Sequence, residues 1–501
     1  MKRSSSPLSS RWIARAATGI AALAGGERLA ALTPVGVTGV FRGEAARGLF
    51  RGGYENVLGT SLDLVIEAAR PSDAAECEAR LLGEIERLRK ILSTYDPASE
   101  ISRVMAGAPV VSTELAELLA AYETWTAHTG GLINVNLGGV IAAWREAAHT
   151  GRVPEPTTLA AAANHARAYN VDALGKAFII DRAVALARRH APGGLIDLGG
   201  DIRAWGETAW PVAIADPRHP ADNALPLARF MLRDAAVATS GGYARFSTVG
   251  GKRFSHLIDP RTLWPLTAGG GATVIAPDCV TANALSTAAS IAGSDAGAAL
   301  AEAHGATGWL FASTAGQVSR GGSLSMEPAA TASAPAAPAN PPSATPPAAN
   351  PWPAGFQVSL SVVLKTHTGP REIFRPYVAV WIEDASGRVV RNLAVWGTEP
   401  NWQRKLTMWS YQTGGRRSNR PVTSRATRAP GTYALVWDGA DDYGHRLSAG
   451  TYKLSLEIVR EDGNHVLESV QLVCAAEPVS AELRATSESD ASTVSYGPAK
   501  N

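Results

Sequence analysis

Cysteine is scarce in this chain of 501 residues, which contains only Cys77, Cys279 and Cys474. The three lie far apart in the sequence, so no Cys-x-x-Cys pair of the kind that binds zinc is present. An odd number of cysteines also gives no disulfide framework. We therefore expect each cysteine to be a buried or idle thiol.

Long apolar runs and a marked net charge are missing as well. No apolar stretch approaches the roughly 20 residues of a membrane-spanning helix. Lysine and arginine number 47 against 45 acidic residues, and this near balance gives no indication that nucleic acid is a partner. With 46% apolar residues the chain can still build a sizeable core, and its length suggests about two to four domains.

The N-terminal segment, residues 1–50, begins with a basic, serine-rich stretch that is followed by a weak apolar run of alanine and glycine. This order is that of a secretory signal, but the segment has no clear cleavage site. No cysteine lies near the start, which disfavours a lipid anchor. We interpret residues 1–50 as a candidate export signal, which predicts a periplasmic location. A cytoplasmic protein is the alternative.

Proline and alanine dominate residues 326–355, which show no apolar periodicity. Such a segment cannot pack a core, so we expect an extended, semi-rigid linker. It separates a body, residues 51–325, from a smaller C-terminal part. The body mixes helical periodicity with alternation and has no regular βαβ order, which favours an α+β fold. The predicted helices lie within residues 76–96, 112–131, 175–194 and 280–305, and the predicted strands within 60–68, 194–206 and 211–217.

Residues 356–478 alternate between apolar and polar side chains, and turn-forming segments such as Asp384–Gly387 separate the alternating runs. Short strands at this spacing predict an all-β, Ig-like antiparallel sandwich. We expect Tyr433 and Trp437 among its core aromatics. Residues 479–501 are predicted to be a disordered tail.

Several residues of the body are candidates for chemistry, each with a plainer alternative. Lys176 follows a loop into a predicted helix, where free N–H groups suit a phosphate, but it could be a solvated lysine. His256 could act as a general acid or base, or it could be structural. Asn283 and Thr287 share a helix face and offer oxygens that suit Mg²⁺, or they could simply pack a helix of small residues.

The stretch "ATSGGYARF", Ala238–Phe246, has two interpretations. It is either a hairpin that braces the His-bearing strand, or a strand and turn that brings Thr239, Ser240 and Tyr243 near His256. The sequence contains no P-loop, no Gly-x-Ser-x-Gly, no His-Glu-x-x-His and no dinucleotide-binding fingerprint. The order of the short motifs is therefore more informative than any one of them.

Taken in order from Gly53 to Ala312, these motifs resemble the ApbE-type flavin transferase family. The matching segments are "LGT" (58–60), "STYDPASEISRV" (93–104), "GLINVNLGGVIAAW" (131–144), "NVDALGKAFIID" (170–181), "DLGGDI", "ATSGGYARF", "SHLIDPRTLWP" and "TANALSTA". The C-terminal part resembles an uncharacterised domain that is sometimes fused to ApbE domains. The resemblance implies an ApbE-like, T-fold-related body before the sandwich.

The resemblance also implies a reaction and a set of site residues. Enzymes of the family split FAD, transfer FMN to a Thr or Ser hydroxyl of a target protein and release AMP, with Mg²⁺ as the metal. The acceptor would carry an Asp-x-x-Ser/Thr-Gly-Ala-Ser/Thr motif, and His256 would lie beside the reacting phosphate. The residues expected to contact FAD are Leu58, Tyr95, Asn134, Val135, Asn136, Asn170, Lys176 and Leu257, and those expected to hold Mg²⁺ are the Ala173 carbonyl, Asn283 and Thr287.

The sequence departs from the family pattern at several of these positions. The usual metal aspartate is Asn283, and Leu263 replaces the glycine of the Asp-Pro-x-Thr-Gly turn. Asparagine also replaces the usual aspartate at positions 134 and 170 and the usual threonine at position 136. We consider Asp278 and Asp172 as substitute metal ligands. The alternatives to an active transferase are a non-catalytic flavin-binding or scaffold protein and an FAD pyrophosphatase.

Overall fold

The computed structural model describes most of the body and of the C-terminal part. The described residues are 48–165, 167–218, 221, 223–224, 226–242, 246–267, 269–322, 324, 351–367, 374–397, 403–413, 424–425, 427–428, 430–442, 444–461 and 463–499. The candidate export signal up to residue 47 and most of the predicted linker lie outside these ranges. All three cysteines are buried free thiols, as predicted.

An antiparallel sheet, whose strands differ in length, forms one layer of the body. Among the described residues it has eight strands in the order β1-β2-β3-β4-β7-β12-β13-β14. The strands are β1 (Gly48–Val57), β2 (Thr60–Ala68), β3 (Gly193–Leu198), β4 (Asp201–Trp205), β7 (Ala236–Gly241), β12 (Gly270–Ala276), β13 (Gly308–Ser313) and β14 (Val318–Gly322). This order puts β4 and β7 side by side at the centre of the sheet, although β5 and β6 lie between them in the sequence.

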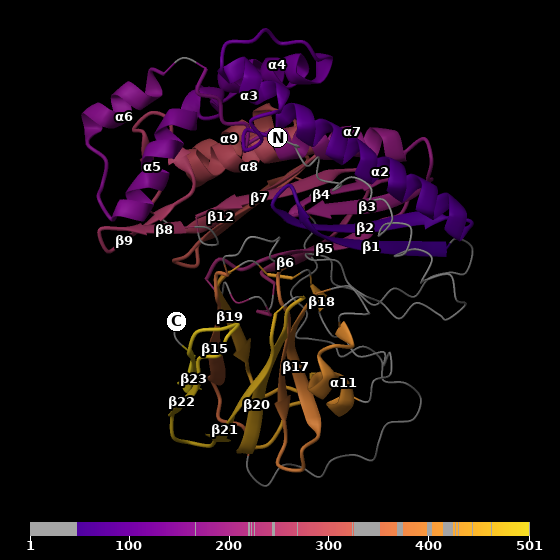
Figure 1. The fold of residues 1–501 in the computed structure, drawn as a ribbon, viewed down its shortest axis with the longest axis vertical. Helices are drawn as coiled ribbons and strands as arrows, with labels where there is room; N and C mark the ends of the chain where they lie inside the picture. Colours follow the sequence, from indigo (N-terminus) through magenta and orange to yellow (C-terminus); the bar gives the residue numbers. More distant parts are fainter. Residues whose placement is uncertain are drawn as a thin grey trace, which may run out of the picture.

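Helices cover one face of this sheet, as Figure 1 shows above the strands. The apolar residues at helical spacing in α2, such as Leu81, Ile85 and Leu88, are buried in the main core of the body. Ser112 caps α4 as its position predicts, since its Oγ accepts from the N–H of Leu115. The helices are α2 (Pro71–Leu92), α3 (Glu100–Met105), α4 (Thr113–His128), α7 (Gly175–Ala187), α8 (Cys279–Ala292) and α9 (Ser294–Ala303).

A smaller lobe extends from one end of this layer. It contains the short helix η1 (Val135–Leu137), α5 (Gly138–Thr150), α6 (Pro156–Ala163), and the hairpins β8 (Phe246–Val249) with β9 (Lys252–Ser255) and β10 (Ile258–Asp259) with β11 (Trp264–Pro265). The ring of Trp144 packs on Phe254 and Trp264, each with ring centroids 5.1 Å apart. Gly138 is required here, because a Cβ would lie 2.5 Å from the Ala168 carbonyl oxygen. The sequence did not predict these hairpins.

The opposite face of the sheet carries the hairpin of β5 (Trp210–Ile214) and β6 (Ala228–Leu232), which closes a second apolar core. This hairpin lies between the sheet and the C-terminal domain (Figure 1). From the β5–β6 connection, Asn223 donates from Nδ2 to the Val436 carbonyl oxygen at 2.6 Å and accepts from the Val436 N–H at 2.9 Å. Asn223 thus joins the two domains through both the NH₂ group and the oxygen of its side-chain amide.

The C-terminal domain is the predicted antiparallel sandwich. Within its described residues one sheet has the order β19-β15-β23-β22 and the other β18-β17-β16-β20-β21. Trp437 lies in its core, and Tyr433 is partly buried and packs against that core, as expected. The elements are β15 (Phe356–Leu364), β16 (Tyr377–Glu383), β17 (Val389–Trp396), α11 (Thr407–Gln412), β18 (Ser424–Arg425), β19 (Gly431–Trp437), β20 (Gly450–Val459), β21 (His465–Cys474), β22 (Val479–Leu483) and β23 (Ser492–Pro498).

The predicted boundaries of this domain were too narrow. Residues 479–498 are not a disordered tail, because β23 lies inside its sheet between β15 and β22. The alternation of buried and exposed residues along β23 supplies Val494 and Tyr496 to the core. At the other end, Trp352 from the predicted linker packs on Trp437 with ring centroids 4.9 Å apart. The sandwich therefore begins near residue 351 and ends near residue 498.

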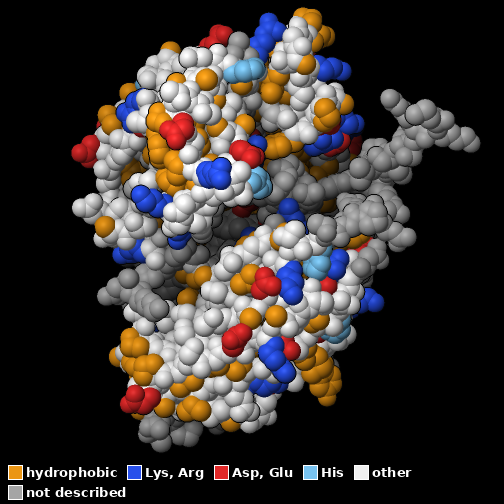
Figure 2. Space-filling model, turned by 60° about the vertical axis from the view of Figure 1, so that its left-hand side comes forward, with side chains coloured by type: hydrophobic (Ala, Val, Ile, Leu, Met, Phe, Trp, Pro, Cys, Tyr) orange, Lys and Arg blue, Asp and Glu red, His pale blue; other side chains and the backbone are white. Residues whose placement is uncertain are grey.

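The surface gives two further observations. In the space-filling view the body and the sandwich stand out as two lobes, and charged side chains of both signs are scattered over each (Figure 2). None of the helices in the described part of the chain combines the length and the apolar character that a membrane crossing requires.

Candidate functional site

The N-terminal turn of α7 brings Lys176 to the turn between β3 and β4. Its Nζ lies 3.0 Å from Asp201 Oδ2 and 3.4 Å from the carbonyl oxygen of Gly199. Gly199 and Gly200 form that turn with φ of +61° and +91°, a conformation that side chains with a Cβ rarely adopt. Lys176 is therefore anchored at the central strands and is not simply solvated, as the plainer interpretation held.

Helix α8 contributes the next part of the site. Asn283 Nδ2 donates to Asp201 Oδ2 at 2.7 Å, and Thr287 Oγ1 donates to Asn283 Oδ1 at 3.4 Å. On strand β7, Ser240 Oγ lies 3.0 Å from Thr287 Oγ1. Asn283, Thr287 and Asp201 are all buried. Polar oxygens from one helix and two strands thus meet where α8 crosses the sheet.

Two acidic residues, Asp63 and Asp197, lie on the strands next to the Gly199–Gly200 turn. Asp197 on β3 faces Asp63 on β2 in the strand register, and its Oδ1 accepts from the N–H of Gly200 at 2.8 Å. Burial and then the charge of Asp63 raise the pKa of Asp197 well above its usual value. Within the described residues, Asp197 Oδ2 has no hydrogen-bond partner. Asp197 thus fixes the turn that Lys176 contacts, while its own second carboxyl oxygen has no hydrogen-bond partner in the described part of the chain.

Asp278 and Asp181 hold the N-terminus of α8. Asp278 is the N-cap residue, and its carboxylate accepts from the N–H and the hydroxyl of Thr281 at 2.8 and 3.0 Å. Asp181 accepts from the N–H groups of Cys279 and Val280, and burial raises its pKa to about 6. Asp278 therefore has a structural role, and Asp201, rather than the expected Asp278, is the carboxylate beside Asn283.

The exposed ring of Tyr95 forms a rim near the start of α7. Tyr95 Oη donates to Asp172 Oδ2 at 3.3 Å and accepts from Arg145 at 2.9 Å. Asn170 Nδ2 donates to the same Asp172 oxygen at 2.9 Å. The Tyr95 side chain is nevertheless 68% exposed. Arg145 also lies 3.9 Å from this oxygen, so Asp172, considered above as a metal ligand, is engaged by Tyr95, Asn170 and Arg145 at this rim.

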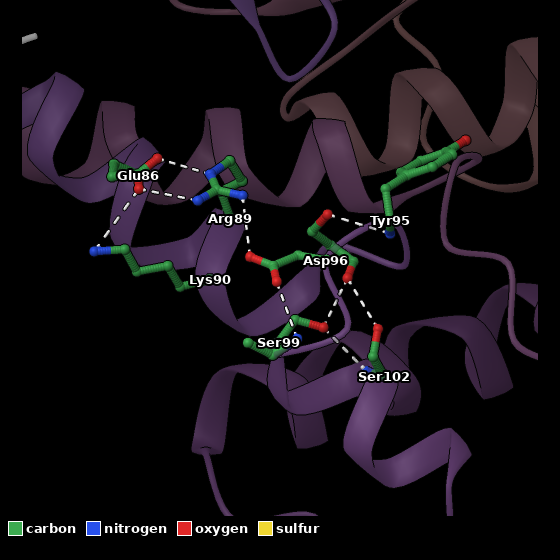
Figure 3. A network of polar contacts seen from close by, with 9 residues as sticks. Glu86, Arg89, Lys90, Tyr95, Asp96, Ser99 and Ser102 are labelled. Atoms are coloured by element: carbon green, nitrogen blue, oxygen red, sulfur yellow. Dashed lines mark hydrogen bonds and ion pairs between the residues drawn. The ribbon is translucent and has the colours of Figure 1, made fainter. Parts of the chain in front are cut away.

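The turn that carries Tyr95 is shaped by the network in Figure 3. Arg89, at the end of α2, lies 3.4 Å from the carboxylate of Asp96, and Ser99 donates to the Ser93 carbonyl oxygen at 2.7 Å. Ser99 also caps α3. Because these contacts use the inner side of the turn, Tyr95 points away from them.

The other residues predicted to contact flavin lie on connecting segments around α7. The carbonyl oxygen of Val135 accepts from the N–H of Asn170 at 2.7 Å, which joins the segment of Asn134, Val135 and Asn136 to the loop before α7. Ala173 lies in that same loop and is partly buried. Leu58 takes a φ of +50° in the β1–β2 turn, and next to it Ser61 accepts from the N–H of Gly199 at 3.0 Å.

His256 and Leu257 lie in the smaller lobe, between β9 and β10. His256 is exposed, and the Leu257 backbone is fixed by Ser255 Oγ and by the N–H of Leu266 at 3.0 and 2.9 Å. Leu263 replaces glycine but keeps a left-handed φ of +64°. The expected turn conformation thus persists despite the changed residue.

The stretch 238–246 begins on β7, against α8 and β12. Ser240 Oγ lies 3.0 Å from Thr287 Oγ1 of α8, and Thr239 Oγ1 lies 2.9 Å from Thr273 Oγ1 of β12. Tyr243 lies outside the described residues. A cleft of about 550 Å³ opens next to Gly242, between residues 259–265 and residues 290–294, where α8 ends and α9 begins. Its volume is within the range of small-molecule sites.

The donor set can be tested against a hard cation. Among the described residues no three His, Cys, Asp or Glu side chains gather into a metal-binding group. Asn283 Oδ1 and Thr287 Oγ1 lie 3.4 Å apart, and oxygen ligands of these kinds suit Mg²⁺. The Asp201 carboxylate instead faces the Asn283 NH₂ group and pairs with Lys176, so the two oxygens of α8 are the part of this set that fits a divalent cation.

Sequence reasoning missed the role of Asp201. In the sequence Asp201 stands only as one residue of the segment "DLGGDI", and it lies 82 positions before Asn283. The one available signal was the asparagine at the expected metal position, which called for an acid elsewhere. The sequence offers many acids, and only the packing of α8 on β4 selects this one.

Comparison with known proteins agrees with these observations. The model of the ApbE family matches residues 58–311, and that of a predicted periplasmic protein (DUF2271) matches residues 358–492. An FAD:protein FMN transferase of Treponema pallidum is 30% identical over 292 residues, covering 49% of this chain and 80% of the relative. One of Haemophilus influenzae is 28% identical over 258 residues, covering 44% and 74%. The solved ApbE protein of Thermotoga maritima covers 55% of this chain and 97% of its own, with 25% identity and a TM-score of 0.48.

Proposed function

The chain belongs to the ApbE family, and on this premise we propose that it transfers FMN from FAD to a Thr or Ser hydroxyl of a target protein. AMP is the second product and Mg²⁺ the metal of the reaction. The observation that carries the proposal is the convergence of Lys176, Asp201, Asn283 and Thr287 at the central strands. A phosphoryl transfer needs such a place, where cations and oriented donors balance the charge of the phosphates.

The reaction exchanges one phosphorus–oxygen bond for another. The bond from the FMN phosphorus to the bridging oxygen breaks, AMP leaves with that oxygen, and the acceptor oxygen bonds to phosphorus. His256, exposed at the edge of the smaller lobe, would take the proton of the acceptor hydroxyl on an imidazole nitrogen. Lys176 would turn its ammonium from Asp201 toward the phosphates, where its charge neutralises the leaving group.

The remaining residues bind the substrate and the metal. Tyr95 offers an exposed aromatic face for a planar ring, with Asn170 beside it. Asn283, Thr287 and the carbonyl of Ala173 would hold Mg²⁺, which when bound supplies positive charge to the phosphate oxygens. Leu58, Asn134, Val135, Asn136 and Leu257 complete the proposed FAD contacts.

Export is also part of the proposal. The match of residues 358–492 to a predicted periplasmic protein supports a periplasmic location, in agreement with the candidate signal in residues 1–50.

The test uses the purified full-length chain with FAD, Mg²⁺ and an acceptor domain that carries an Asp-x-x-Ser/Thr-Gly-Ala-Ser/Thr segment. Mass spectrometry of the acceptor and chromatography of AMP should show one FMN added for each AMP released. Release of AMP with free FMN would identify an FAD pyrophosphatase. Bound but intact FAD would identify a non-catalytic flavin-binding protein, for which Asn283 at the metal position is the supporting observation.

His256→Ala should reduce turnover by about a factor of 100 or more, which is the usual contribution of a general base. His149→Ala is the matched control, because His149 is exposed in the last turn of α5 and has no role in the proposed reaction. Equal turnover of His256→Ala and the unmodified chain would remove His256 from the mechanism.

A further inference from the structure

The cleft of about 550 Å³ lies between two elements on which the proposed reaction depends. One wall is the hairpin of β10 and β11, which begins two residues after His256 and contributes Trp264 to the lining. The opposite wall is the C-terminal end of α8, the helix that carries Asn283 and Thr287. The cleft therefore opens between the segment that follows the proposed base and the helix that bears two of the proposed metal ligands.

Hydrogen bonds connect the wall of this cleft to the candidate metal site. Ser290, which lines the cleft, donates from its Oγ to the carbonyl oxygen of Ser240 at 2.9 Å. The Oγ of the same Ser240 lies 3.0 Å from Thr287 Oγ1. Two serines thus link the wall of the cleft to the proposed metal ligand Thr287.

The charge of the lining does not suit the phosphates of FAD. Among the described residues that line the cleft there is no lysine or arginine, and the one acid, Asp259, is 8% exposed and paired with Arg261 at 2.7 Å. A diphosphate needs compensating cations, and Lys176, which supplies such a charge, is not among the described lining residues. The same holds for every residue proposed to contact FAD or Mg²⁺. The cleft is therefore suited to the other substrate of the reaction.

The composition of the lining fits an extended, uncharged segment of a protein. Small side chains make up much of it, among them residues 269–272 at the start of β12 and Ala289 of α8. Two larger apolar side chains of the lining are exposed, Trp264 by 37% and Val318 by 44%. The Trp264 ring packs on Trp144, which holds it in place before a partner binds. An aromatic ring held in this way is a typical anchor for a protein partner.

We propose that this cleft binds the segment of the target protein that carries the acceptor hydroxyl. The proposal rests on the proposed function for the existence of such an acceptor, and it adds the place where the acceptor docks. The segment is extended, has small uncharged side chains next to the hydroxyl, and places an apolar side chain against Trp264 and Val318. In this position its hydroxyl can reach the space between the hairpin that follows His256 and helix α8.

Two substitutions in the lining test this assignment in the full-length chain. Val318→Lys brings a charge to the cleft, and Trp264→Ala removes the aromatic anchor. Each should raise the KM for the acceptor domain of the transfer assay about tenfold or more. The Kd for FAD, followed by flavin fluorescence without acceptor, should stay within about twofold of that of the unmodified chain.

The matched controls are Val473→Lys and Tyr411→Ala in the sandwich. Their side chains are 54% and 80% exposed, so the same chemical changes are made on the surface of the other domain. Both controls should leave the KM for the acceptor domain unchanged. Circular dichroism confirms that each variant is folded.

Binding of the acceptor domain without FAD, measured by calorimetry, separates this inference from the proposed function. FMN transfer with a KM that neither Val318→Lys nor Trp264→Ala changes would refute only this inference. An equal loss of FAD binding in the two variants would also refute it, because the cleft would then belong to FAD. Acceptor binding that depends on Val318 and Trp264, without FMN transfer, would refute only the proposed function. An unmodified chain that neither binds nor modifies the acceptor domain would refute both.

Discussion

In the body, burial raises the pKa of several carboxyl groups, whereas in the sandwich the buried Glu488 lies against a cation and a backbone N–H group that lower its pKa. Burial raises the pKa of Glu78 to about 7 and that of Asp181 to about 6. In the sandwich, burial also acts on Glu488, but hydrogen bonds from Arg460 and from the N–H of Asn464 outweigh it and lower the pKa. Glu78 and Asp181 on one side and Glu488 on the other thus show opposite pKa shifts for the same chemical group.

This difference in pKa shift distinguishes the candidate site in the body from the acids that have a structural role in the sandwich. Compensated acids such as Glu488 and Glu457 fix segments of the sandwich, since Glu457 holds the N–H groups of Met408 and Trp409 at the start of α11. Asp197 in the body holds the Gly199–Gly200 turn while its second oxygen has no partner in the described part of the chain. Uncompensated charge reduces stability, and such charge gathers at functional sites.

The largest expected effect concerns the stability of the sandwich. Glu488→Ala should lower its free energy of unfolding by about 3 kcal/mol, because the substitution leaves Arg460 without its buried partner. Hydrogen exchange of the β15 and β20 amides in increasing urea measures this loss. Glu468→Ala breaks the exposed pair with Arg484 and should cost about 0.5 kcal/mol or less. Similar losses for the two variants would show that burial does not distinguish these pairs.

A corresponding substitution in the body should affect activity. Lys176→Met should reduce AMP release in the FAD assay by about a factor of 100, since one charged donor to the phosphates is removed. The control is Lys453→Met in the sandwich, where the lysine pairs with Glu383 at 3.3 Å, and its turnover should be unchanged. If both lysines proved equally dispensable, the distinction between the two ion pairs would fail.

The contributions of Glu78 in the body and of Glu488 in the sandwich to the pH dependence of stability should have opposite signs. The pKa of Glu78 is raised from 4.5 in the unfolded chain to about 7 in the folded protein. Its contribution to the stability of the body is therefore fully present below pH 4.5 and is lost as the pH rises through about 7. The lowered pKa of Glu488 stabilises the sandwich above its unfolded value, and this contribution is lost as the pH falls. Each group contributes up to about 1.4 kcal/mol per pH unit within its window.

Denaturant unfolding at pH 4 to 8, with each domain followed by hydrogen exchange, measures these slopes. Asp197→Asn should flatten the fall in body stability as pH rises, because it removes an acid whose pKa is raised while keeping the bond to the N–H of Gly200. An unchanged slope in this variant would mean that Asp197 keeps its ordinary pKa in the folded protein.

The smallest expected effect concerns the contact between the domains. Asn223→Ala removes both hydrogen bonds to Val436 and should weaken docking by about 1–2 kcal/mol. Hydrogen exchange at the N–H of Val436 should become faster, while the core strands of each domain keep their protection. Asn164→Ala, an exposed position at the end of α6, is the control. Unchanged exchange at Val436 would show that other contacts hold the domains together.

The sequence was informative where the signal is local. The spacing of Leu81, Ile85 and Leu88 predicted α2, and Ser112 predicted the start of α4, because helix periodicity and capping depend on neighbouring residues. Alternation predicted the sandwich in the same way. Residues 479–498 were misjudged because the strands there are short and polar. Their alternation acquires a buried face only when β23 pairs with β15.

The sequence by itself thus determined the two-domain order, the α+β body, the sandwich and the ordered motifs that carry the family resemblance. Only the tertiary structure decided which acid stands at Asn283. The candidate Asp278 is near in sequence but is used to cap α8, whereas Asp201 is 82 residues away and is in contact. The physical reason is that a hydrogen bond between helix and strand depends on sheet order and on packing, and neither is encoded in the local spacing of residues.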